Sequence, residues 1–188
     1  RGYNINFIAP QNTEVDMSQN IESILNESHS YSTGTLNYDI NIPYVEDDGF
    51  YEDENGTILL GTLKGLVEFN NDVFYPIYEK HQLLRSRVID IEKINDSYIL
   101  GTKGVGLVIL NNDTIFNFRI EDGLSSNSIT SLYFDGEFLW TGTNKGLNKI
   151  TLDRKGSKII NIENIYSFHG LISNNIKDIS KYNSDIFI

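Results

Sequence analysis

The sequence repeats itself at a nearly constant interval over most of its length. A Gly-Thr pair followed by a Gly-Leu pair occurs in "ILLGTLKGLVEF", in "YILGTKGVGLVIL" and in "LWTGTNKGLNKI". The glycines of the three Gly-Thr pairs are Gly61, Gly101 and Gly142, so the intervals are 40 and 41 residues. A fixed period of this length is typical of proteins that are built from stacked structural units.

The glycine-rich stretches could also suggest a phosphate-binding loop. Such a loop needs a Gly-Lys-Ser/Thr ending, which "GTKGVG" lacks. A phosphate loop also has no reason to recur every 40 residues. We therefore interpret the Gly-Thr glycines as sites where one unit's backbone approaches its neighbour closely, and the Thr as a residue that favours an extended strand.

Each unit reads as four short strands. In the clearest copy, "ITSLYF" alternates with period two, Asp135-Gly136 is a tight turn, and "FLWTGT" and "GLNKITL" follow on either side of a two-residue turn. The segments "KIINI" and "IYSF" supply the outer strand, and "TIFNFRI" holds that place in the preceding unit. Four antiparallel strands about every 40 residues predict an all-β fold made of β-propeller blades.

The domain boundaries follow from where the repeat begins. Residues 1–47 are either an irregular segment or a degenerate blade, and residues 48–188 contain the blades centred on Gly61, Gly101 and Gly142. The last unit stops at "SDIFI", where the pattern requires Gly-Thr next. We therefore expect a truncated last blade and an incomplete ring of about three to four blades.

Composition narrows the functional classes. The formal net charge of −11 argues against nucleic acid, which needs a basic protein face, and against an anionic membrane surface. No apolar run approaches the roughly 18 residues of a membrane span, so this segment is expected to make no membrane contact. The chain has no cysteine, and His29, His81 and His169 lack the converging spacing of a zinc site. We expect neither a metal nor a cofactor.

The most regular unit, "DGLSSNSITSLYFDGEFLWTGTNKGLNKI", closely resembles the repeat of two-component regulator propellers. The resemblance covers residues 48–188, although Leu60 and Leu100 stand where the motif has the tryptophan that is Trp140 here. It implies the extracytoplasmic sensor of a membrane-anchored bacterial signalling protein, located in the periplasm or outside the cell. It further implies a histidine kinase as the output, an oligosaccharide as the ligand, and no enzyme activity in the propeller itself.

The resemblance also implies a larger ring than this chain can form. A ring of about seven blades needs roughly 290 residues, and the chain has 188. An open set of blades exposes sheet faces and edges, which favours self-association. We therefore expect either that two copies pair as a homodimer or that further sequence completes the ring.

Candidate ligand-binding residues precede the first strand of each unit. In a propeller this loop opens near the central channel on one face, where Asn and Arg side chains can pair with sugar hydroxyls or with a uronate or sulfate. The alternative is that Ser and Asn simply form the turn. The residues in these loops are Arg85, Ser86 and Arg87, then Ser126 and Asn127, and then Asn174 and Asn175.

Two histidines occupy equivalent positions just before these loops. His81 and His169 each precede a Gln-Leu or Gly-Leu step, and Asp122 holds that place in the middle unit. They either contact a ligand or act as polar turn residues. Trp140 could similarly stack on a sugar ring, but the pattern favours a place in the core of the blade.

Two other functional classes remain open. The acidic runs at 46–48 and 52–54 could in principle supply a pair of catalytic carboxylates, but they surround a predicted turn and are more simply a solvated rim. A secreted polysaccharide-degrading enzyme is therefore the weakest alternative. A propeller that serves as a scaffold for protein partners, with no small ligand, is the second.

Overall fold

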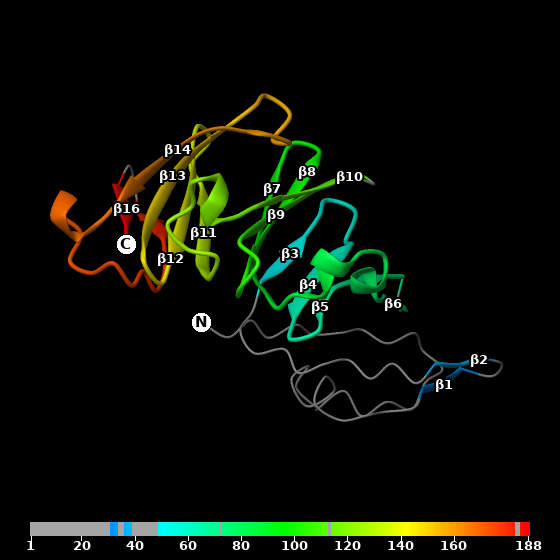
Figure 1. The fold of residues 1–188 in the computed structure, drawn as a ribbon. Coiled ribbons are helices and arrows are strands. Elements are labelled where there is room, and N and C mark those ends of the chain that lie inside the picture. Colours follow the sequence, from blue (N-terminus) through cyan, green and yellow to red (C-terminus); the bar gives the residue numbers. More distant parts are fainter. Residues whose placement is uncertain (1–30, 34–35, 39–48, 72, 113, 183–184) are drawn as a thin grey trace. The chain divides into compact units, whose positions relative to one another are not determined.

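The computed structural model describes residues 31–33, 36–38, 49–71, 73–112, 114–182 and 185–188 (Figure 1). The chain divides into two compact units, Arg1–Asp47 and Asp48–Ile188. In the first unit the described residues form one antiparallel hairpin, β1 (Tyr31–Thr33) and β2 (Leu36–Tyr38). His29 and the acidic run at 46–48 lie outside the described residues, and a degenerate blade within residues 1–47 stays a prediction.

The second unit consists of four antiparallel sheets in chain order, as the repeat predicts. No α-helix occurs in the described part of the chain, and none of its helical segments is long and apolar enough to cross a bilayer. The fold is therefore all-β, with three complete blades and the first part of a fourth. The first blade consists of β3 (Phe50–Glu52), β4 (Ile58–Thr62), β5 (Gly65–Asn70) and β6 (Val73–Tyr75), and the second of β7 (Val88–Ile94), β8 (Ser97–Thr102), β9 (Leu107–Asn111) and β10 (Thr114–Phe118). The third blade consists of β11 (Ile129–Phe134), β12 (Leu139–Thr143), β13 (Gly146–Leu152) and β14 (Ile159–Ile165). The incomplete fourth blade has β15 (Ser180–Tyr182) and β16 (Asp185–Phe187).

The outer strands end earlier than the sequence pattern predicts. β14 stops at Ile165, and Ser167–His169 form the short 3-10 turn η4. β10 likewise stops at Phe118, and Ile120–Asp122 form the 3-10 turn η3. The predicted outer strands "IYSF" and "TIFNFRI" are therefore wrong at their C-terminal ends. Each strand ends where a side chain of the following 3-10 turn accepts a hydrogen bond from the backbone N–H just before that turn. The connection between the first two blades contains η1 (Ile77–Glu79) and η2 (Gln82–Arg85).

The hydrophobic core lies between successive blades. Leu107 and Ile109 of the second blade pack in one buried cluster with Leu139 and Ile150 of the third. A second cluster joins the first and second blades. Full burial of one Leu or Ile side chain contributes about 1.5–3 kcal/mol. Because these side chains are buried between blades, each blade is stabilised mainly by its neighbours.

The first strands of the second and third blades each begin with a pairing irregularity. The pairing of β7 with β8 shifts between Val88 and Asp90, and that of β11 with β12 shifts between Ile129 and Ser131. A bulge of this kind bends the strand locally and redirects its side chains. The residue before each bulge faces the preceding blade, as Ile129 does against Gly101, and the residue after it faces the following blade, as Asp90 does toward Leu132.

Candidate functional site

The loops before the first strands and the turns between the second and third strands meet at one rim of the unit. We call this the loop rim; it comprises the turns 63–64, 103–106 and 144–145 and the loop segments 85–87, 126–128 and 174–175. Figure 1 shows the turns after β4, β8 and β12 at the lower ends of their sheets. Backbone hydrogen bonds tie the turns to the loops: Lys103 N donates to Arg87 O at 3.0 Å, Gly104 N to Asn127 O at 2.9 Å, and Ile176 N to Thr143 O at 3.0 Å.

The threonine of each Gly-Thr pair holds the turn of its own blade. The Oγ1 atoms of Thr62, Thr102 and Thr143 donate to the carbonyl oxygens of Gly65, Gly106 and Gly146, at 2.8, 2.6 and 2.8 Å respectively. The same hydroxyls accept hydrogen bonds from backbone N–H groups inside the turns at 3.0–3.2 Å. All three threonines are fully buried. The sequence alone predicted a strand preference for these threonines, but not this hydrogen bond.

The glycine of each Gly-Thr pair faces the next blade. A Cβ at Gly101 would lie 2.8 Å from Cγ2 of Ile129, and a Cβ at Gly142 would lie 2.8 Å from Cγ2 of Ile176. At Gly61 the neighbouring atom is the carbonyl oxygen of Val88, at 2.5 Å. Such distances leave no space for a side chain. The prediction that these glycines permit close approach between blades is confirmed.

Asn127 and Asn174 both cap a 3-10 turn with their side-chain oxygens. Asn127 Oδ1 accepts from Ile120 N at 2.8 Å, and Asn174 Oδ1 accepts from Ser167 N at 2.6 Å. The turn-forming interpretation therefore accounts for one end of each amide. The Nδ2 donor of each side chain is the end that can contact a ligand. Asn127 is half-buried, whereas Asn174 and Asn175 are exposed.

The two histidines also act within turns. Nδ1 of His81 accepts from Leu83 N at 3.2 Å, and Nδ1 of His169 accepts from Tyr166 N at 3.1 Å. Asp122 Oδ2 makes the equivalent hydrogen bond with Arg119 N at 2.9 Å. Asp122 and His169 thus close their turns in the same way, whereas His81 caps the start of its turn. The Nε2 atom of each imidazole is the nitrogen that a ligand could contact.

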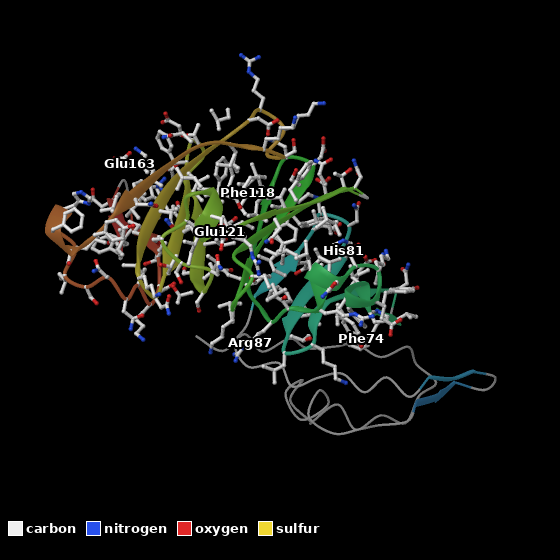
Figure 2. The ribbon with its side chains drawn as sticks, in the orientation of Figure 1. Phe74, His81, Arg87, Phe118, Glu121 and Glu163 are labelled. Carbon is white, nitrogen blue, oxygen red and sulfur yellow. The ribbon has the colours of Figure 1, made fainter. Side chains whose placement is uncertain are left out.

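The arginines of the first connecting loop belong to the same rim. Nε of the exposed Arg85 donates to Tyr78 O at 3.3 Å, which ties this side chain to its own loop. Arg87 is half-buried, and Figure 2 shows it at the lower edge of the sheets, on the side of the loop rim. The structure thus brings Arg85, Arg87 and Asn127 to one rim, and the loop that carries Asn174 and Asn175 joins it through Ile176.

A buried polar network that the sequence did not predict lies beneath the third blade's part of the rim. Asn148, which is fully buried, accepts from Ser125 Oγ at 2.9 Å and donates from Nδ2 to Asn164 Oδ1 at 2.7 Å. Ser125 Oγ also lies 2.9 Å from Thr143 Oγ1. The network fixes the connecting loop to the strands of the blade that follows it. The repeat signature contained the signal, because Asn148 replaces the valine found at this position in the other two blades.

Carboxylates on β7 form a second group that sequence reasoning missed. Asp90 Oδ2 accepts from Leu132 N at 2.7 Å, and Glu92 Oε1 accepts from Phe134 N at 3.2 Å. Burial raises the pKa of Asp90 and raises that of Glu92 to about 7. In the next interface, Ser131 Oγ accepts from Ile179 N at 3.1 Å. These side chains join first strands of neighbouring blades.

The acidic run at 52–54 belongs to a turn, as the solvated-rim interpretation expects. Asp53 Oδ1 accepts from Asn55 N and Thr57 N, each at 2.9 Å, and hydrogen bonding to these backbone groups lowers the pKa of Asp53. Among the described residues, no group of three His, Cys, Asp or Glu side chains is placed to hold a metal ion.

Trp140 is half-buried and packs against the small core cluster that includes Leu147 and Ile176. Its Nε1 donates to Asp135 Oδ2 at 2.7 Å, and Lys149 Nζ lies 5.5 Å from the centre of its ring. Asp135 also caps the turn between β11 and β12 by accepting from Phe138 N at 2.7 Å. The tryptophan is therefore tied to the turn at the end of the blade that lies opposite the loop rim.

Comparison with known proteins supports the fold. No protein-family model and no curated protein matches the chain. Among solved structures, the extracellular domain of BT4673 from B. thetaiotaomicron, named there a hybrid two-component system, has a TM-score of 0.60 at 20% identity over 73% of this chain and 18% of that one. The extracellular domain of BT3049 from the same organism, named likewise, has a TM-score of 0.57 at 18% identity over 74% of this chain and 20% of that one. The chain thus spans a fifth or less of these domains, and the likeness establishes its fold.

Proposed function

We propose that this chain is part of the extracytoplasmic ligand-sensing propeller of a bacterial two-component signalling protein and that its loop rim contacts an oligosaccharide. The observation that carries the proposal is the fold shared with the extracellular domains of BT4673 and BT3049. The rim adds the required chemistry, because amide and guanidinium groups donate to sugar hydroxyls. The location that follows is the periplasm or the cell exterior, in a membrane-anchored protein whose output is a histidine kinase.

In this proposal the propeller binds and transmits, and it performs no reaction. Ligand binding can only bias an equilibrium between packings that already exist. The side-chain hydrogen bonds between first strands, such as the one between Asp90 and Leu132, are contacts through which a change at the rim alters blade packing. A homodimer of two open blade sets belongs to the same proposal.

A scaffold for protein partners is the second candidate, and exposed apolar side chains favour it. Phe168 is 78% exposed and Ile172 is fully exposed, on the connection that follows the third blade. Phe168 stacks on Tyr166, with ring centroids 5.4 Å apart. An exposed apolar group of this kind is suited to protein contact.

Calorimetric titration of the full-length protein with a panel of oligosaccharides tests the two candidates. Three rim variants are compared: Arg85→Ala, Arg87→Ala and Asn127→Asp, the last of which keeps the capping oxygen and removes the amide donor. Arg154→Ala, in the exposed turn between β13 and β14, is the matched control. Saturable heat with one glycan class that is lost in the rim variants, but kept in the control, is the expected result. If the protein is folded but gives no heat with any glycan, the scaffold function would replace the sensor function as the proposal.

A further inference from the structure

The loop rim carries several cations and no carboxylate. Its turns and loop segments contain Lys64, Arg85, Arg87, Lys103 and Lys145, and they contain no Asp or Glu. The whole chain has 26 acidic residues and only 15 Lys and Arg. A third of the basic residues thus lies on one rim of a strongly acidic protein.

The opposite rim has the reverse balance. The turns of this rim that the structure describes in full are 53–57, 95–96, 135–137 and 153–158. These turns hold six acidic residues and three basic ones. The acidic residues are Asp53, Glu54, Asp96, Asp135, Glu137 and Asp153, and the basic ones are Arg154, Lys155 and Lys158.

Three lysines place one cation on each complete blade. Lys64, Lys103 and Lys145 lie in the turns between second and third strands, and all three are exposed. The threonine hydroxyl of each Gly-Thr pair fixes the turn backbone from below. In the described part of the chain no hydrogen bond or ion pair engages the three ammonium groups. The three ammonium groups therefore extend from turns with a fixed backbone conformation and are available to bind a ligand.

No carboxylate of the connecting loops that the structure describes pairs with these three ammonium groups. Asp122 uses Oδ2 to accept from Arg119 N at 2.9 Å, within its own 3-10 turn. Glu121 lies on that same turn. The three lysines thus place an exposed positive charge on each of three neighbouring blades.

We propose that the loop rim selects an anionic oligosaccharide, whose carboxylate or sulfate groups pair with Lys64, Lys103 and Lys145. The inference rests on the proposed function and specifies its ligand class. A neutral sugar needs no cation, whereas each anionic group of a charged glycan can pair with one of these exposed lysines. Arg85 adjoins the turn that carries Lys64, and a guanidinium is well suited to a carboxylate or sulfate. The acidity of the rest of the chain makes this rim the surface that attracts an anion.

The test is calorimetric titration of the full-length protein with four probes: an oligogalacturonide, a sulfated oligosaccharide, a neutral oligosaccharide of equal length, and an oligoglutamate peptide of equal charge. The rim variant is Lys64→Gln, Lys103→Gln and Lys145→Gln combined. The matched control removes three charges from the opposite rim: Arg154→Gln, Lys155→Gln and Lys158→Gln. Circular dichroism of both variants checks that they fold.

We expect one of the two anionic glycans to bind, which also distinguishes uronate from sulfate, and the rim variant to weaken it about tenfold while the control does not. Raising the salt concentration should weaken binding further, because the charges are exposed. Equal binding of the neutral glycan, unchanged in the rim variant, would overturn the anionic ligand and leave the sensor function standing. Equal binding of oligoglutamate would overturn glycan selection at this rim. No binding of any glycan would remove the sensor function as well.

Discussion

The carboxylate of Asp90 accepts a hydrogen bond from the backbone N–H of Leu132 at 2.7 Å, across the interface between two blades. Asp90 lies on β7 and Leu132 on β11, and the two residues are 42 positions apart in the chain. Ser131 repeats the relationship with Ile179 in the next interface, at 3.1 Å. A side chain on the first strand of one blade thus accepts a hydrogen bond from a backbone N–H at the first strand of the next blade. Neighbouring blades are therefore joined by polar contacts between their first strands as well as by the apolar core.

Replacing Asp90 with Ala should open this interface locally. The change leaves the Leu132 N–H without its acceptor, and loss of a partner from a buried donor costs about 1–3 kcal/mol. We expect faster hydrogen exchange at the Leu132 amide in the full-length protein, measured by exchange mass spectrometry. Asp96→Ala, on the exposed turn between β7 and β8, is the control. Unchanged exchange in the Asp90 variant would show that the interface does not depend on this hydrogen bond.

The same interface should respond to pH through Glu92. Burial, together with a smaller effect of the Asp90 charge, raises the pKa of Glu92 from 4.5 to about 7. The folded state therefore holds a proton that the unfolded state releases between these two values. Because the folded pKa is the higher one, this group contributes stability below pH 4.5 that is lost as the pH rises through about 7.

The expected loss is about 1–3 kcal/mol, once the screening of a partly exposed carboxylate is allowed for. The measurement is the thermal unfolding midpoint between pH 5 and pH 8, compared between the natural protein and Glu92→Gln. The glutamine variant should have a flatter profile over this range. Identical profiles would place the source of any pH dependence at another group.

The blades could be predicted from the sequence because the residues that form them repeat at a fixed interval. The Gly-Thr pairs repeat at 40 and 41 residues, and the close contact of Gly101 with Ile129 explains why glycine is needed there. The alternation of "ITSLYF" and the Asp135-Gly136 turn likewise place β11 and the start of β12 correctly. These features depend on local backbone chemistry and on a neighbour that is the next copy of the same unit.

The polar side chains of the candidate site could be located but not oriented from the sequence. Asn127 and His169 lie in the predicted loops, yet their side chains accept hydrogen bonds from backbone groups three or seven residues away. Asp90 and Glu92 alternate with apolar residues like any half-exposed strand positions. Their acceptor role depends on which backbone N–H of the next blade lies opposite, and that register is a tertiary property.

Thr102 should be more important for stability than an ordinary strand threonine. Its fully buried Oγ1 donates to Gly106 O at 2.6 Å and accepts from Val105 N at 3.2 Å. Thr102→Val keeps the shape and removes both hydrogen bonds, so we expect a loss of about 1–3 kcal/mol in the free energy of unfolding.

Thr114→Val is the matched control, because Thr114 is exposed at the start of β10. Chemical denaturation of the two variants measures the difference. Equal stabilities would mean that the Thr102 hydroxyl holds the turn no better than water does.

Gly101→Ala should push the second and third blades apart. The added Cβ would lie 2.8 Å from Cγ2 of Ile129 and 3.3 Å from Cγ of Leu132, so one of the first strands must shift. Overpacking of this kind costs about 1–3 kcal/mol. The measurement is the free energy of unfolding of Gly101→Ala, both in the natural sequence and together with Ile129→Ala, which removes the clashing methyl group. The alanine at 101 should cost less in the second background, because the space is then available. An equal cost in both backgrounds would place the strain within the backbone of β8 instead of at the contact between blades.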